Sequence, residues 1–330
     1  MNAIPIRDRC IRMIVATLCF PLTIVQTVIA KLYAKKYRQP GELVAIGTDH
    51  LHAIITGNGK STVVLESGMG GVSLDWSLVQ HEISGHATVL SYDRAGFGFS
   101  NRLLKMPTCQ QYVEDLRCLL HTKQLKPPYI LVGHSYGGMI IRLFASQYRD
   151  EVAGLVLVDA AHESRFIPKE MGAIGKEKRR ISRKLLRLGY LLSPIAIPRF
   201  MKRHIGSRNL PSSIQKVIKQ RGYRNEAYRT AYAEMLCTEM SAEQLVAAPP
   251  LPNHMPVIVM SAGKQDEEWK KGQEKLLDIT GKVTHINVED SWHSIQVHRP
   301  DTVIAAIKSS LFIGNNCNDK VGNVQKNSII

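Results

Sequence analysis

From Pro40 onward, short apolar segments alternate with segments of helical character. Residues 43–46 and 51–55 are apolar runs separated by turn residues, and this pattern predicts a β-hairpin. The other predicted strands are residues 62–66, 87–92, 129–133, 154–159, 256–261 and 282–288, with helices between them. Strands that alternate with helices form a mostly parallel sheet with helices on both faces, so we expect an α/β fold.

The alternation is interrupted over residues 162–250, where no convincing strand is present. This segment has helical character and ends in a proline-rich boundary formed by Pro249, Pro250 and Pro252. We therefore expect one domain over residues 39–312, in which this segment is a helical cap inserted over the carboxyl edge of the sheet.

The protein is basic, with a net charge of +15 at pH 7, and residues 165–229 contain 18 Lys or Arg against three acidic residues. Residues 176–192 predict a basic amphipathic helix, because basic residues lie between apolar residues at helical spacing, Ile181, Leu185, Leu188 and Leu192. Its apolar side either rests on the sheet or faces an anionic membrane and guides a lipid-like acyl substrate to the site. No nucleic-acid-binding motif accompanies the charge, so nucleic acid is not an expected partner.

The N-terminal segment differs from the rest, because residues 13–30 carry no charge and basic residues flank them on both sides. A helix of this length spans about 27 Å, close to the roughly 30 Å hydrocarbon core of a bilayer. We therefore expect residues 1–38 to form a single-pass membrane anchor. The alternatives are a signal peptide cleaved from a secreted protein and an amphipathic helix on a surface. At the other end, residues 313–330 are polar and predict a loose tail.

The cysteines indicate neither a disulfide framework nor a structural metal. They are scattered, with no CxxC pair and no histidine at zinc-binding spacing. We therefore expect no metal and no disulfide scaffold. The six positions are Cys10, Cys19, Cys109, Cys118, Cys237 and Cys317.

The sequence Gly133-His134-Ser135-Tyr136-Gly137 follows a predicted strand and precedes a predicted helix. A serine on such a sharp turn projects its hydroxyl from the edge of the sheet, and the glycines let strand and helix approach closely. Ser135 is therefore the candidate nucleophile.

A serine needs a base to take its proton, and His293 is the best candidate because it follows the last predicted strand. His298 is the weaker alternative. The base in turn needs a carboxylate to orient it. Asp266 follows the preceding strand and completes the order Ser, Asp, His, so we predict it as the acid, with Asp159 as the alternative.

Two backbone N–H groups are predicted to bind the oxyanion that develops during acyl transfer. One belongs to Tyr136, directly after the candidate nucleophile. The other is expected from the loop after residues 62–66, at Met69, because Gly68, Gly70 and Gly71 allow this loop to bend toward the site.

These motifs resemble the α/β-hydrolase superfamily, a group of serine esterases, lipases and related hydrolases. The resemblance covers about residues 40–312 and rests on Gly-His-Ser-Tyr-Gly-Gly at 133–138, Tyr-Asp-Arg-Ala-Gly-Phe-Gly-Phe-Ser at 92–100, Asp266 and the segment at 293–301. The resemblance implies that the second motif shapes the loop beneath the site. Ser67 stands where the family usually has histidine, but a backbone N–H donor does not depend on that side chain.

The resemblance and the predicted triad together imply a membrane-tethered hydrolase of carboxylic esters that forms an acyl-enzyme on Ser135 and uses no cofactor. The alternatives are an amidase, thioesterase, lipase or C–C hydrolase with the same serine, or a non-catalytic binding protein on the same fold. Dehalogenases and epoxide hydrolases of this superfamily use an aspartate nucleophile, and Ser135 argues against both.

Overall fold

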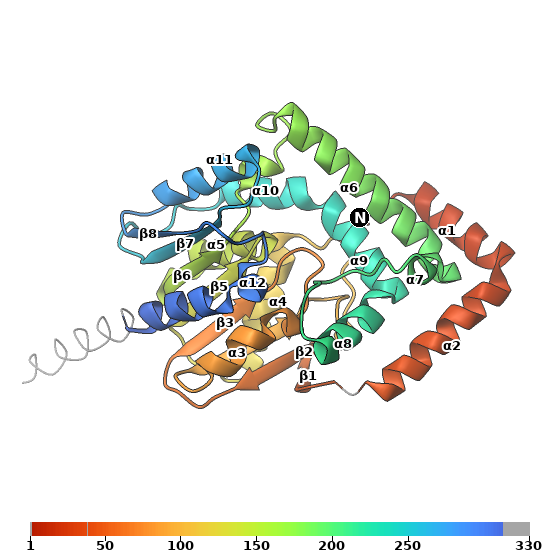
Figure 1. Ribbon diagram of the computed structural model, residues 1–330, viewed down its shortest axis with the longest axis horizontal. Coiled ribbons are helices and arrows are strands. Elements are labelled where there is room, and N and C mark those ends of the chain that lie inside the picture. The colour runs from red at the N-terminus through yellow and green to blue at the C-terminus, as the bar shows by residue number, and fades with distance from the viewer. Residues whose placement is uncertain (1, 38, 313–330) are drawn as a thin grey trace, which may run out of the picture.

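The computed structural model describes residues 2–37 and 39–312 (Figure 1). The predicted polar tail at 313–330, with Cys317, lies outside the described residues. One mostly parallel sheet has the strand order β1-β2-β4-β3-β5-β6-β7-β8, and only the β1–β2 and β2–β4 pairs are antiparallel. Its strands are β1 (Glu42–Ile46), β2 (Asp49–Thr56), β3 (Thr62–Glu66), β4 (Thr88–Asp93), β5 (Tyr129–His134), β6 (Val152–Val158), β7 (Val257–Ala262) and β8 (Val283–Val288).

Helices cover both faces of the sheet (Figure 1). Successive side chains of a strand point to opposite faces, so apolar residues of one strand pack against helices on both sides. In β3, Val64 packs with residues of α4 and α5, whereas Val63 and Leu65 pack with residues of α3, α12 and the helical residues 300–312. The core helices are α3 (Ser77–Ile83), α4 (Cys109–Thr122), α5 (Tyr136–Gln147), α11 (Glu267–Lys275) and α12 (Ile295–His298). Short 3₁₀ turns are η1 (Ser73–Trp76), η2 (Arg149–Glu151), η3 (Glu163–Arg165), η4 (Ser193–Ile195) and η5 (Leu276–Asp278).

The segment between β6 and β7 is helical and lies over the carboxyl end of the sheet (Figure 1). We call this whole segment the cap. Its α-helices are α6 (Ala173–Leu192), α7 (Ile197–Phe200), α8 (Ser212–Gly222), α9 (Asn225–Leu236) and α10 (Thr238–Ala247). The predicted amphipathic helix is present as α6. However, Ile181, Leu185 and Leu188 are exposed, so its apolar side does not rest on the sheet.

The predicted continuous N-terminal helix is not formed. The chain instead has α1 (Ile6–Leu18) and α2 (Phe20–Lys36), joined at Cys19 with a bend of 94°. Pro21 explains the break, because proline has no N–H for the helical ladder and its ring clashes with the preceding turn. Within residues 2–37 and 39–312, no single helix combines the length and apolar composition needed to cross a membrane, and only this bent pair does so when taken together.

The helix pair formed by α1 and α2 packs against the outer side of the cap (Figure 1). Asp8 is 1% exposed and accepts hydrogen bonds from Arg187 of α6 and Tyr232 of α9. Gln26 is 2% exposed and donates from Nε2 to the Tyr223 carbonyl at 2.8 Å. Both helices therefore hold the cap through a buried polar side chain.

A buried ion network joins the cap to the sheet. The Arg94 guanidinium, just after β4, lies 2.6 Å from Glu66 of β3 and 3.0 Å from Glu234 of α9. Its other donor contacts are the carbonyls of Ser67, at 2.5 Å, and Gly68, at 2.7 Å. One side chain therefore fixes the loop after β3 relative to both the sheet and the cap.

We predict that Arg94→Ala destabilises the protein by about 3–5 kcal/mol, because it leaves Glu66 and Glu234 buried without their partner. Urea unfolding of the purified variant measures this loss. Arg180→Ala is the matched control, since Arg180 pairs with Glu177 in an exposed bridge on α6. An equal loss of unfolding free energy in the two variants would show that the buried ion network contributes no more than an exposed salt bridge.

Candidate active site

Ser135 lies on a sharp turn between β5 and α5. Its backbone has φ 52° and ψ −121°, a conformation that non-glycine residues rarely adopt. The turn also requires close backbone contacts. A Cβ on Gly133 would lie 2.8 Å from the Gly137 carbonyl carbon, and a Cβ on Gly137 would lie 2.6 Å from the backbone carbonyl oxygen of Glu66. The Gly-x-Ser-x-Gly spacing therefore forms the strand–turn–helix elbow expected from the sequence.

The structure brings Ser135 and His293 together as predicted. The Oγ of Ser135 is 2.9 Å from Nε2 of His293, which lies in the segment between β8 and α12. The other ring nitrogen, Nδ1, is 2.6 Å from Oδ2 of Asp159. Hydroxyl, imidazole and carboxylate thus form one continuous hydrogen-bonded chain.

The third member of this chain is Asp159 and not Asp266, which corrects the sequence prediction. Asp266 caps α11: its Oδ1 accepts the Trp269 N–H at 3.1 Å, and its Oδ2 pairs with Lys178 of the cap at 2.9 Å. These contacts direct its carboxylate away from His293. Asp159, the sequence alternative, directly follows β6, which lies beside β5 in the sheet. It has φ 41°, so its backbone is also in the left-handed region.

Asp159 is fully buried and is held by further donors that sequence reasoning missed. Its Oδ1 accepts the Ala262 N–H at 3.1 Å and the Trp269 Nε1–H at 2.9 Å, and its Oδ2 accepts the Gln265 amide at 2.7 Å. The segment that contains Asp266 therefore supports the acid and does not supply it.

His134 precedes the candidate nucleophile in the sequence and contacts the candidate base, His293. Its Nε2 lies 3.1 Å from the His293 carbonyl, and the two rings are 4.7 Å apart. Burial lowers the pKa of His134 to about 3, so its ring stays neutral and Nε2–H donates to that carbonyl. The rival base His298 is exposed at the end of α12.

The loop after β3 passes close to the nucleophile. A Cβ on Gly68 would lie 2.9 Å from Nδ1 of His134 and 3.2 Å from the Ser135 Cβ, so a side chain here would displace one of these groups. Arg94 binds the Gly68 carbonyl, and a trans peptide directs the following N–H, that of Met69, to the opposite side. Tyr136 is the first residue of α5, so its N–H has no acceptor within the helix. Tyr136 directly follows Ser135, and Met69 lines the same cavity as Ser135; the role of their N–H groups in oxyanion binding stays a prediction.

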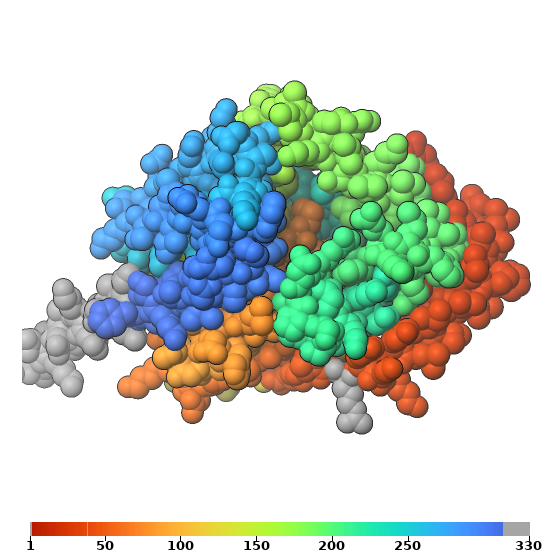
Figure 2. Space-filling model, viewed as in Figure 1, coloured from red at the N-terminus to blue at the C-terminus, as the bar shows by residue number. Residues whose placement is uncertain are grey.

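A cavity of about 490 Å³ opens at Ser135 and His293. The space-filling view shows the molecule hollowed between the cap and the C-terminal segments (Figure 2). The cap residues that line this cavity are mostly apolar, and they include Leu185 and Leu186 of α6 and Met235 near the end of α9. A polar end is formed by Asp75, His204 and Ser207. The cavity can hold an apolar acyl group and one polar substituent.

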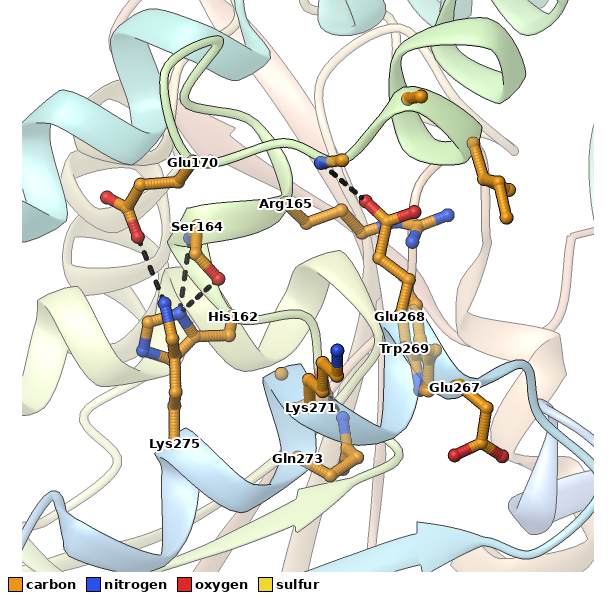
Figure 3. Close-up of a pocket in the computed structure, with 15 residues that line it drawn as sticks. His162, Ser164, Arg165, Glu170, Glu267, Glu268, Trp269, Lys271, Gln273 and Lys275 are labelled. Carbon is orange, nitrogen blue, oxygen red and sulfur yellow. Dashed lines mark hydrogen bonds and ion pairs between the residues drawn. The ribbon is translucent and has the colours of Figure 1, made fainter.

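A second cavity, of about 540 Å³, lies between α11 and residues 160–174 and includes neither Ser135 nor His293 (Figure 3). Several of its charged groups are engaged in contacts within the wall of the cavity. Lys275 bonds Glu170 at 3.0 Å, and the Arg165 guanidinium stacks 4.6 Å over Trp269. Among the residues that the structure describes, no group of three or more His, Cys, Asp or Glu could hold a metal ion.

Known proteins share this fold. A family model described as "Alpha/beta hydrolase family" matches residues 63–306. The uncharacterised Bacillus subtilis protein YqjL is 26% identical over 261 residues, which are 76% of this chain and 83% of that protein. A thermophilic esterase from Thermogutta terrifontis superposes with a TM-score of 0.63 at 23% identity, over 84% of this chain and 99% of the esterase. The epoxide hydrolase CorEH superposes with a TM-score of 0.65 at 18% identity, over 81% and 96%. Likeness at this level of identity shows the fold alone.

We predict that Asp159→Asn lowers turnover by about 10⁴-fold, because an amide in place of the carboxylate favours the wrong imidazole tautomer. Asp266→Asn is the matched control. It keeps the side-chain oxygen that caps α11 and should leave most of the activity. Rates of chromogenic ester hydrolysis by the two purified variants measure the difference. A larger loss in Asp266→Asn would return the acid to that position.

The buried carboxyl at the polar end of the cavity predicts a pH-dependent stability. Asp75 is 2% exposed, and burial raises its pKa to about 7. A raised folded-state pKa contributes stability that is present below the unfolded-state pKa of 3.8 and is lost as pH rises through about 7.

We therefore predict that Asp75→Asn, compared with the unaltered protein, gains about 2–3 kcal/mol of relative stability when the pH is raised from about 5 to about 8. Urea unfolding of both proteins at the two pH values provides the measurement. A stability difference that is the same at both pH values would show that Asp75 does not titrate in this range.

Proposed function

We propose that this chain, which belongs to the alpha/beta hydrolase family and is a hydrolase, cleaves carboxylic esters through an acyl-enzyme on Ser135. The observation that carries the proposal is the hydrogen-bonded chain from Ser135 through His293 to Asp159, at 2.9 and 2.6 Å. This chain supports the proposal, because an imidazole lies within hydrogen-bond reach of the serine hydroxyl and a buried carboxylate lies behind the imidazole.

In the proposed reaction, Nε2 of His293 takes the hydroxyl proton while Oγ of Ser135 attacks the ester carbonyl carbon. Asp159 accepts a hydrogen bond from Nδ1–H of His293 and stabilises the imidazolium that forms. The N–H groups of Met69 and Tyr136 bind the oxyanion. His293 then returns the proton to the alcohol oxygen, which leaves.

The acyl-enzyme is released by the same groups. His293 takes a proton from water, the hydroxide attacks the acyl carbon, and the proton passes to Ser135 Oγ as the carboxylic acid departs. Each step uses these side chains and water, so the proposed mechanism requires no metal or organic cofactor. A serine at the elbow also distinguishes this chemistry from that of relatives with an aspartate nucleophile.

The shape of the cavity supports an acyl substrate of moderate size. The apolar cap residues provide a surface for an acyl chain, and the Asp75 end provides hydrogen-bonding groups for one polar substituent. An ester, amide or thioester presents the same carbonyl to Ser135, so a panel of chromogenic acyl substrates is the experiment that ranks them.

We predict that Ser135→Ala lowers hydrolysis by about 10⁶-fold and abolishes covalent labelling by a fluorophosphonate, because the nucleophilic oxygen is lost. Circular dichroism of the variant checks that the fold is retained. Ser182→Ala is the matched control, since Ser182 lines the same cavity from α6 and should remain labelled. Hydrolysis near the original rate in folded Ser135→Ala would refute the proposed function.

A further inference from the structure

The outer side of the helix pair α1–α2 is apolar. In α2, exposed apolar residues recur at helical spacing on one side, and α1 repeats this arrangement before the bend. Their exposed fractions lie between 44% and 78%. The residues are Ile6, Met13, Ile14 and Leu18 of α1 and Phe20, Ile24, Val25, Val28 and Leu32 of α2. Together they form the outer apolar face.

The inner side of the same pair is held by polar contacts. The buried residue of α1 is Asp8 and that of α2 is Gln26, and each bonds the cap. Gln26 also accepts from Nε of Arg199 at 3.0 Å. A helix on a water-exposed surface normally buries its apolar side and exposes its polar side. Here the one fully buried side chain of each helix is polar, whereas the residues of the outer apolar face are exposed, so this face is suited to contact with an apolar phase.

The charge on the helix pair indicates which kind of apolar partner fits the outer apolar face. Asp8 is the one acidic residue in residues 2–37, and it is buried against Arg187. The exposed charges are therefore all positive. Lys31 and Lys35 follow Ile24 and Val28 on the same side of α2, where their long side chains can reach past the apolar residues to an anionic group. The basic residues are Arg7, Arg9, Lys31, Lys35 and Lys36, besides the partly buried Arg12.

The apolar exposure continues toward the catalytic cavity along α6. Ile174, Ile181, Leu185 and Leu188 of α6 are exposed, and α6 packs directly against α1. Leu185 is 63% exposed and also lines the cavity at Ser135. A substrate in the apolar phase that contacts α6 would therefore lie next to the opening of the site.

From these observations we propose that the outer apolar face binds an anionic lipid bilayer, with α1 and α2 lying in the plane of the membrane interface. The apolar side chains enter the boundary between headgroups and acyl chains, and the basic residues contact acidic headgroups. Asp8 and Gln26 keep the pair on the cap, so the cap is held at the bilayer surface. This binding does not depend on the proposed hydrolysis.

Flotation of the full-length protein with vesicles tests the proposal, because bound protein rises with the lipid and aggregates do not. Vesicles of phosphatidylcholine with about 30% phosphatidylserine should bind the protein, and pure phosphatidylcholine should bind it roughly tenfold more weakly. Binding should also weaken from 0.1 to 1 M salt, as the Debye length falls from about 10 to about 3 Å. Equal, salt-insensitive binding to both vesicles would overturn the anionic preference.

The triple variant Ile24→Ser/Val28→Ser/Leu32→Ser should lose binding by roughly tenfold or more, because it removes apolar side chains that enter the bilayer. Val246→Ser is the matched control, since Val246 is equally exposed but lies on α10. Unchanged binding of the triple variant would refute the proposal. So would a stable dimer in solution that the triple variant dissociates, since a second copy would then cover the face.

A depth measurement separates lying in the interface from crossing the bilayer. Phe20→Trp places a fluorophore beside the bend, 62% exposed in the unaltered protein. Its added fluorescence should be quenched by lipids brominated near the headgroup and much less by lipids brominated near the chain end. Strong quenching from the chain ends would mean that the pair inserts deeply, and the in-plane arrangement would be wrong.

Discussion

The buried guanidinium of Arg94 is the interaction on which the arrangement of the site depends. It joins a carboxylate of the sheet, Glu66, to a carboxylate of the cap, Glu234, and holds the carbonyls of Ser67 and Gly68. The remaining Glu234 oxygen accepts the Gly70 N–H at 3.0 Å. Charges buried in this way are tolerated only when each is paired, so cap, sheet and loop are fixed relative to one another. The loop that carries the Met69 N–H is consequently held beside Ser135.

The candidate triad shows how a parallel sheet brings distant residues together. Ser135 and Asp159 follow neighbouring strands, β5 and β6, whose carboxyl ends lie at the same edge. His293 lies in the segment after β8 and contacts both Ser135 and Asp159. Trp269 and Gln265, from the segment after β7, hold the carboxylate of Asp159. The segments after β5, β6 and β8 therefore each contribute a member of the candidate triad, and the segment after β7 contributes donors to Asp159.

The N-terminal helix pair shows why an uncharged run does not define a membrane span. The hydrophobic composition of residues 13–30 suggested one straight helix, but Pro21 divides it and the bend is 94°. Composition also conceals which side of a helix is buried. The one fully buried side chain is polar in both helices, Asp8 in α1 and Gln26 in α2. Apolar side chains of the pair are therefore left on its outer surface. Leu185 and Leu188 of α6 are also exposed, although α6 buries Tyr190 and Leu191.

The sequence by itself determined the α/β class, the hairpin, the elbow at Ser135 and the pairing of Ser135 with His293. The first three follow from local properties: strand and helix periodicity, and glycines that a tight strand–helix turn requires. The pairing follows from the position of Ser135 and His293 after two predicted strands of a mostly parallel sheet, because the carboxyl ends of such strands lie at one edge. Only the tertiary structure decided that Asp159, rather than Asp266, contacts His293. Both follow a strand in the sequence, and the choice depends on the order of strands in the sheet, on the left-handed backbone of Asp159, and on the capping bond that directs Asp266 toward α11. Which of two carboxylates that both follow a strand reaches His293 is set by strand order and packing, which no local pattern encodes.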